Sequence, residues 1–128
     1  MKTLLFIGAV FILTSCSSTV KFPVSQLVPA ADISAKVQKQ GGTNYLVVIT
    51  ANNLASSERL SPPRKYYIIW VVSESGATRN VGHFRQKNAI QTEYKASFPY
   101  KPAEVFITAE DEEALCQPTG IEISRVKF

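Results

Sequence analysis

Few residues in this chain of 128 carry side chains suited to catalysis, and they are scattered. There are two cysteines, Cys16 and Cys116, and one histidine, His83. A catalytic cysteine needs a nearby base, and a zinc site needs closely spaced ligands, whereas these residues are far apart in the sequence. The acidic run at 110–113 lacks the spaced pattern of a calcium loop and is predicted to be a solvated turn. We also find no phosphate loop and no serine nucleophile elbow. The sequence therefore predicts no metal, no cofactor, no catalytic residue and no enzymatic activity.

Cys16 stands apart because of the residues that precede it. Lys2 is followed by an apolar run at 4–13, which is shorter than the roughly 20 residues that a bilayer-spanning helix needs. A run of this length is typical of a secretory signal peptide. The sequence LTSC, which ends at Cys16, resembles the lipobox of bacterial lipoproteins. In that family the cysteine thiol receives a diacylglyceryl group, the leader is cut just before the cysteine, and the new amino terminus receives a fatty acid such as palmitate.

This resemblance implies that residues 1–15 are a lipoprotein signal peptide and that Cys16 carries the lipid. Each buried methylene contributes about 0.8 kcal/mol, so three acyl chains would hold the mature protein on a membrane. Ser17 stands where lipoproteins retained on the inner membrane of enteric bacteria have aspartate, which favours the outer membrane and leaves the leaflet open. The alternatives are an ordinary signal peptide, or an uncleaved helix, with Cys16 incidental. With Cys16 acylated, Cys116 lacks an intramolecular partner and is expected to be an inert, partly buried thiol near a loop.

The rest of the sequence predicts a single all-β domain. Residues 16–31 contain serines and two prolines without a clear period, so they are interpreted as a lipidated tether. Residues 32–128 contain short runs rich in β-branched and aromatic residues, separated by turn signals. With no convincing long helix, these runs indicate an immunoglobulin-like antiparallel β-sandwich of about seven strands. The predicted strands are 33–40, 44–51, 66–74, 78–84, 91–98, 103–110 and 120–128.

The only tryptophan is the predicted centre of the core. Trp70 belongs to the most hydrophobic of the predicted strands, and a side chain of its size fills the middle of a sandwich. We expect it to be buried between the two sheets, with Val48 or Ile49 and Phe106 nearby. The histidine, His83, lies in another predicted strand, where a structural or surface role is expected.

The candidate binding site is the longest connection, residues 52–65. Irregular loops longer than about 12 residues are uncommon unless they have a function. Its three basic residues are Arg59, Arg64 and Lys65. Two prolines stiffen this segment and lower the ordering cost of binding. We expect the positive cluster to bind an envelope protein, an anionic envelope polymer or a membrane surface. A second interpretation, compatible with the first, is a short helical turn in which Leu54 and Leu60 plug one end of the sandwich.

A second resemblance extends over residues 66–123. The segments YYIIWVV, GATRNVGHF, FPYKPAEVFITAE and PTGIEI are similar to the extracytoplasmic C-terminal domain of zinc-associated bacterial anti-sigma factors. The matching positions are Tyr67, Trp70, Gly76, Gly82, Phe84, Phe106, Thr108, Glu110, Pro118 and Gly120. Members of that family carry a cytoplasmic zinc-binding domain and a transmembrane helix, in whose place this chain has a lipobox. The resemblance therefore implies the fold and an envelope role, and sigma-factor binding does not carry over.

These features predict a lipid-anchored, non-enzymatic binding module in the bacterial cell envelope. The alternative, implied by the second resemblance, is an envelope-sensing input domain related to anti-sigma regulation. A cell-wall-active enzyme is the third candidate, and it would need paired carboxylates or a nucleophile with its base. The formal charge of +4 suits anionic partners. Nucleic acid is not an expected partner of an exported domain whose aromatic residues follow core patterns.

Overall fold

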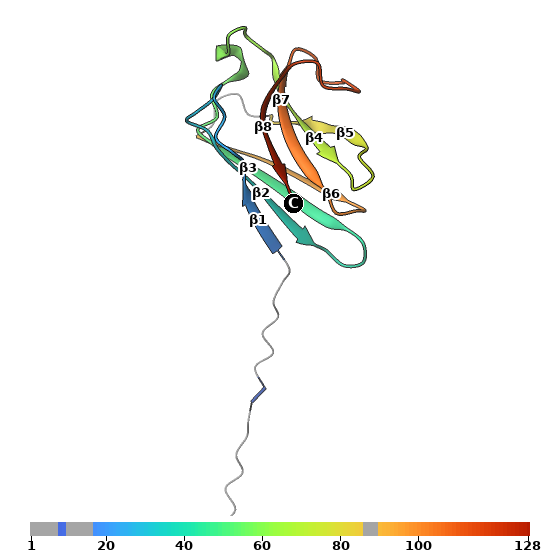
Figure 1. The fold of residues 1–128 in the computed structure, drawn as a ribbon. Coiled ribbons are helices and arrows are strands. Elements are labelled where there is room, and N and C mark those ends of the chain that lie inside the picture. The colour runs from blue at the N-terminus through green and yellow to red at the C-terminus, as the bar shows by residue number, and fades with distance from the viewer. Residues whose placement is uncertain (1–7, 10–16, 86–89) are drawn as a thin grey trace, which may run out of the picture.

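The computed structural model describes residues 8–9, 17–85 and 90–128, and these residues form eight β-strands and one short 3-10 helix. The elements are β1 (Ser17–Lys21), β2 (Asp32–Lys39), β3 (Tyr45–Asn52), η1 (Ser57–Arg59), β4 (Tyr66–Val72), β5 (Thr78–His83), β6 (Gln91–Phe98), β7 (Glu104–Glu110) and β8 (Ile121–Lys127). Two antiparallel four-stranded sheets, in the orders β1-β2-β3-β6 and β5-β4-β7-β8, pack against each other (Figure 1). The predicted all-β antiparallel sandwich is confirmed, and the seven predicted strands are all present.

The burial of each strand follows from its place in a sheet. In β2 the alternate residues Ile33, Ala35 and Val37 are buried, while Lys36 between them is exposed, as expected for a sheet with one wet face. In β4 and β7 the last six residues are all buried, because these central strands are covered on both faces. A strand covered on both faces needs apolar residues at nearly every position, which is why the run at 66–72 has no polar member.

The apolar residues form two clusters on opposite faces of the second sheet. The main core lies between the sheets and includes Ile49 of β3 with Ile69 of β4. The smaller cluster consists of Ile68, Trp70, Val72 and Phe106, and it lies on the other face. Successive side chains of a strand point to opposite faces, so Ile69 and Trp70 cannot both point inward.

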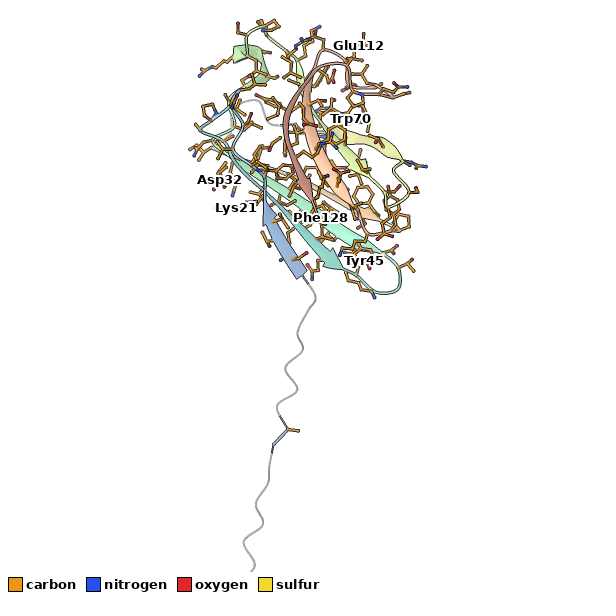
Figure 2. All side chains as sticks on the ribbon, in the orientation of Figure 1. Lys21, Asp32, Tyr45, Trp70, Glu112 and Phe128 are labelled. Carbon is orange, nitrogen blue, oxygen red and sulfur yellow. The ribbon has the colours of Figure 1, made fainter. Side chains whose placement is uncertain are left out.

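The prediction that Trp70 lies between the sheets is therefore wrong. Trp70 is fully buried, but on the outer face of the second sheet, away from Ile49. The expected neighbour Phe106 is confirmed, since the two residues pair across β4 and β7 with ring centroids 6.0 Å apart. Figure 2 labels Trp70 beside β4 and β7. The burial of an outward-facing tryptophan means that another segment must cover this face.

The predicted tether contains a strand that belongs to the domain. Residues 17–21 pair with β2, and Ser17 lies opposite Gln38. The following connection also packs on the domain, because Phe22 and Val28 are buried in the main core. In addition, Ser124 Oγ donates a hydrogen bond of 2.7 Å to the carbonyl oxygen of Pro23. The sandwich therefore begins at Ser17.

Because the strands are antiparallel, the connections between them gather at two opposite ends of the sandwich. The Ser17 end is where β1 begins, and it includes residues 40–44, 73–77 and 99–103. The far end includes residues 22–31, 53–65 and 111–120. In Figure 2, Tyr45 lies near the Ser17 end and Glu112 lies at the far end.

Candidate binding surfaces

The predicted binding connection was residues 52–65; Asn52 ends β3, and residues 53–65 fold over the far end of the main core. Leu54 and Leu60 are partly buried against that core, so the expectation that these leucines plug one end of the sandwich is confirmed. Tyr67 Oη donates a hydrogen bond of 2.6 Å to the carbonyl oxygen of Ala55. Burial raises the pKa of Tyr67 to about 12, so its hydroxyl keeps the proton that it donates. The connection is thus fastened to β4 and forms an ordered surface.

The three basic residues predicted to bind a partner have different environments. Arg59 and Lys65 are exposed. Arg64 instead places Nη1 3.1 Å from Asp111 Oδ2, and its side chain is only 24% exposed. The Nε atom of Arg64 is buried without a hydrogen-bond partner, which is costly for a charged group. Arg64 therefore links the 53–65 connection to Asp111, and of the three residues only Arg59 and Lys65 are exposed and form no ion pair with another described residue.

Exposed apolar side chains surround the same end of the molecule. In the described part of the chain, the large hydrophobic residues that are exposed are Val24 (74%), Leu27 (42%), Ile90 (85%) and Ile121 (39%). All of them lie in or beside connections at the far end. The backbone N–H of Asn53 donates to the carbonyl oxygen of Ile90 at 2.8 Å, which places Ile90 next to the 53–65 connection. Isolated apolar residues on a surface are ordinary, and the feature of note is that these four are restricted to one end of the molecule.

The outer face of the second sheet is covered by residues 111–120, which we call the cover loop. Leu115 packs against the cluster that contains Trp70. Asn80 Nδ2 donates hydrogen bonds to the carbonyl oxygens of Glu113 and Leu115, at 2.8 and 3.0 Å. His83 Nε2 lies 3.2 Å from Glu113 Oε2, so the histidine has a structural position, as expected. The acidic run was predicted to be a solvated turn, and residues 111–113 are indeed exposed, although Glu113 also contacts β5 and Glu110 is buried.

The thiol of Cys116 is part of the cover loop. The residue is free and exposed, so the expectation of a partly buried thiol is wrong. The cover loop keeps its apolar contact at the neighbouring Leu115, which is half-buried, and turns Cys116 outward.

A buried carboxylate holds the base of the cover loop. Glu110 Oε1 accepts hydrogen bonds from the backbone N–H groups of Thr119 and Gly120, at 2.9 and 2.7 Å, and Oε2 accepts one from Thr119 Oγ1 at 2.8 Å. Burial by itself raises the pKa of Glu110. The hydrogen bonds from Gly120, Thr119 and Thr108 lower the pKa by more than burial raises it, so the pKa is below its usual value. Trp70 Nε1 donates to Thr108 Oγ1 at 2.8 Å and extends this network under the loop. Glu110 therefore has a structural role, since its carboxylate fixes the end of the cover loop.

The Ser17 end contains a cleft that the sequence did not predict. Its volume is about 710 Å³, and it is lined by Tyr45, Ser73, Glu74, Ser75, Ala77, Arg79, Pro99, Tyr100 and Lys101. These residues come from β3, the β4–β5 turn, β5 and the β6–β7 connection. No local sequence pattern could have revealed the cleft, because its walls meet only when the two sheets pack.

The β4–β5 turn forms an ordered wall of the cleft. The backbone N–H of Ser73 donates to the carbonyl oxygen of Ala77 at 3.0 Å, and that of Gly76 donates to the carbonyl oxygen of Ser73 at 2.9 Å. Gly76 has a φ of +88°, which other residues rarely adopt, so this turn requires a glycine. The opposite wall is fixed by a hydrogen bond of 2.8 Å from the Ala103 N–H to the carbonyl oxygen of Val72. The cleft is thus preorganised.

The predicted lipid site, Cys16, lies outside the described residues. Within the described ranges no helix is long and apolar enough to cross a membrane. The same residues contain no group of histidine, cysteine and acidic side chains that could hold a metal ion. Comparison of the chain with protein-family models, with curated proteins and with solved structures finds no match.

Proposed function

We propose that this protein is a lipid-anchored binding module of the bacterial cell envelope, held on a membrane through Cys16, and that it binds an envelope protein through its far end. The observation that supports a protein partner is the restriction of exposed large hydrophobic residues, among the described residues, to that end. The exposed cations Arg59 and Lys65 lie in the same region. An apolar surface beside positive charge suits a protein that offers apolar contacts bordered by acidic side chains.

The position of Ser17 helps to choose among the partners expected from the sequence. A lipid on Cys16 would be one residue from β1, and thus beside the Ser17 end. Strands of seven or eight residues, at about 3.3 Å per residue, place the far end about 25 Å away. Charges on a membrane surface are screened within about 8 Å at physiological salt, so Arg59 and Lys65 are too distant to bind that surface. An anionic polymer would bind the positive charges and leave the exposed apolar residues without a role, whereas a protein partner would contact the charges and the apolar residues.

The anchor is tested by replacing the thiol. Cys16→Ala should leave an unprocessed precursor that incorporates no labelled fatty acid, because no other cysteine lies beside the predicted cleavage site. The measurements are precursor mass and radiolabelled palmitate incorporation in a bacterial host. Cys116→Ala is the matched control and should be processed and labelled normally. Normal processing and labelling of Cys16→Ala would refute the lipid anchor.

The binding surface is tested by photo-crosslinking in intact cells. A crosslinking amino acid at Ile90, at the far end, should give a discrete adduct, while the same group at Lys36, on the outer face of the first sheet, should not. Arg59→Ser with Lys65→Ser should reduce the Ile90 adduct several-fold, since charges at the rim of an interface contribute modestly to association. The melting temperature should change little, because both side chains are exposed. Equal adducts from both positions would refute the far-end site.

Two further functions have less support. Envelope sensing, the alternative implied by the anti-sigma resemblance, is favoured by one observation: the cover loop is held at the surface by polar contacts, of Arg64 with Asp111 and of His83 with Glu113, that a bound partner could replace. An enzyme acting on cell-wall material would need two convergent carboxylates, and the cleft at the Ser17 end is lined by one, Glu74. Enzymatic activity is therefore not part of the proposal.

A further inference from the structure

We propose that the Ser17 end of the sandwich is a membrane-facing surface, and that its cleft receives the phosphate of an anionic phospholipid headgroup between Arg79 and Lys101. The proposal rests on the lipid anchor proposed above, because the anchor determines which end faces the bilayer. It assigns a role to a surface opposite the far end. The two ends would then bind different partners, a lipid surface and a protein.

The first argument is the distance between the predicted anchor and the fold. β1 begins at Ser17 and pairs with β2 from its first residue, so no free tether separates the domain from Cys16. One residue spans at most about 3.6 Å. A lipid on Cys16 would therefore hold the first residue of β1 next to the headgroups and turn the Ser17 end of the sandwich toward the bilayer. In Figure 1 the first residue of β1 lies at this end of the sandwich.

The second argument is the charge that this end presents. Its exposed basic residues are Lys39, Arg79, Lys101 and Lys127. Among the described residues, Arg79 and Lys101 have no ion-pair partner, and both line the cleft, where they outnumber its one carboxylate, Glu74. Lys127 approaches Glu104 at only 3.9 Å and is 77% exposed. Cations without protein partners, placed beside a bilayer, are positioned to bind anionic headgroups.

The third argument is the chemistry of the cleft. Tyr45 and Tyr100 are half-buried in its walls, and tyrosine is enriched at membrane–water interfaces, where one side of the ring is apolar and the hydroxyl is hydrated. The ring of Tyr100 is supported by Phe98, at 6.0 Å between centroids. None of the exposed large hydrophobic residues of the described chain lies at this end. The surface is therefore suited to bind headgroups without inserting into hydrocarbon.

The experiment uses residues 17–128, which contain all eight strands and both apolar clusters. Binding is measured by sedimentation with vesicles of equal parts phosphatidylglycerol and phosphatidylcholine, in low salt, and with vesicles of phosphatidylcholine alone. Arg79→Gln with Lys101→Gln should weaken binding to the anionic vesicles about 30-fold, since each basic side chain near such a surface contributes about five-fold. The matched control, Lys36→Gln with Lys95→Gln, removes the same charge from the outer face of the first sheet and should reduce binding much less. Thermal melting confirms that each variant is folded.

Three results would overturn the proposal. The first is an equal loss of binding in the two charge pairs, which would show that only net charge matters. The second is unchanged binding of the Arg79 and Lys101 variant. The third is complete competition by millimolar glycerol phosphate, which would make the cleft a site for a free phosphate compound. None of these measurements uses Cys16, so failure of the proposed anchor, seen in normal processing of Cys16→Ala, remains a separate result.

Discussion

Replacing Glu110 should destabilise the protein in a pH-dependent way, and the hydrogen bonds at this residue allow the effect to be estimated. In Glu110→Gln, the side-chain carbonyl can still accept from Thr119 N and Gly120 N, because both bond to Oε1. What is lost is the negative charge that strengthens them, worth about 1–2 kcal/mol. Glu110→Ala also leaves these groups without an acceptor and opens a cavity, and should cost about 3–4 kcal/mol.

The pH dependence follows from the direction of the pKa shift. The pKa of Glu110 is lower in the folded protein than its ordinary value of 4.5. A carboxyl with a lowered pKa contributes stability at pH values above its unfolded pKa, and loses that contribution as the pH falls through the folded pKa. The difference between wild type and Glu110→Gln should thus be full at pH 7 and shrink below about pH 4.5.

The assay is urea unfolding at pH 7 and at pH 3, followed by the fluorescence of Trp70, the only tryptophan. Trp70 lies under the cover loop that Glu110 holds, so its emission reports opening of this loop as well as global unfolding. Glu93→Gln is the control, because Glu93 is an exposed carboxylate of β6. The reasoning would be refuted if Glu110→Gln had wild-type stability at pH 7, or if its deficit were as large at pH 3 as at pH 7.

Two further predictions concern the cover loop. Leu115→Ser should shift the emission of Trp70 to longer wavelength, because Leu115 packs on the outer cluster. The control is Leu54→Ser, which changes the main core and should leave the native spectrum unchanged. Equal spectral shifts in the two variants would contradict the placement of Trp70 on the outer face. Gly120→Ala should lower the free energy of unfolding by about 3 kcal/mol, since an added Cβ would lie 1.9 Å from the carbonyl oxygen of Ala109; a melting temperature within 1–2 °C of wild type (a change of well under 1 kcal/mol) would contradict this close approach.

The strands from residue 32 onward could be predicted because their signal is local. Alternation in β2 and the unbroken apolar run of β4 report the solvent exposure of each residue along one strand, and no distant part of the chain is needed to interpret them. β1 was missed because an edge strand of five residues, with three small polar ones, has too weak a pattern to distinguish it from a linker. β1 is a strand because it pairs with β2, and this pairing forms only when the sheet folds.

The candidate sites were predicted less completely. The basic residues of the 53–65 connection are adjacent in sequence, and so they were found. The ion pair between Arg64 and Asp111 joins residues 47 positions apart, so nothing local showed that Arg64 was already engaged. The cleft at the Ser17 end was missed for the same reason, since it is built from separate connections.

The sequence by itself determined the order of the main strands and the residues that must be buried. These properties depend on hydrophobicity and spacing within a few neighbouring residues. The tertiary structure decided which face each buried residue occupies. Every position of β4 from Tyr67 to Val72 is apolar or aromatic, so the sequence alone did not show which of the two alternating sets of side chains faces the first sheet. The first sheet packs on the side of Ile69, and the cover loop, held by Glu110 and Asn80, buries Trp70 on the other side.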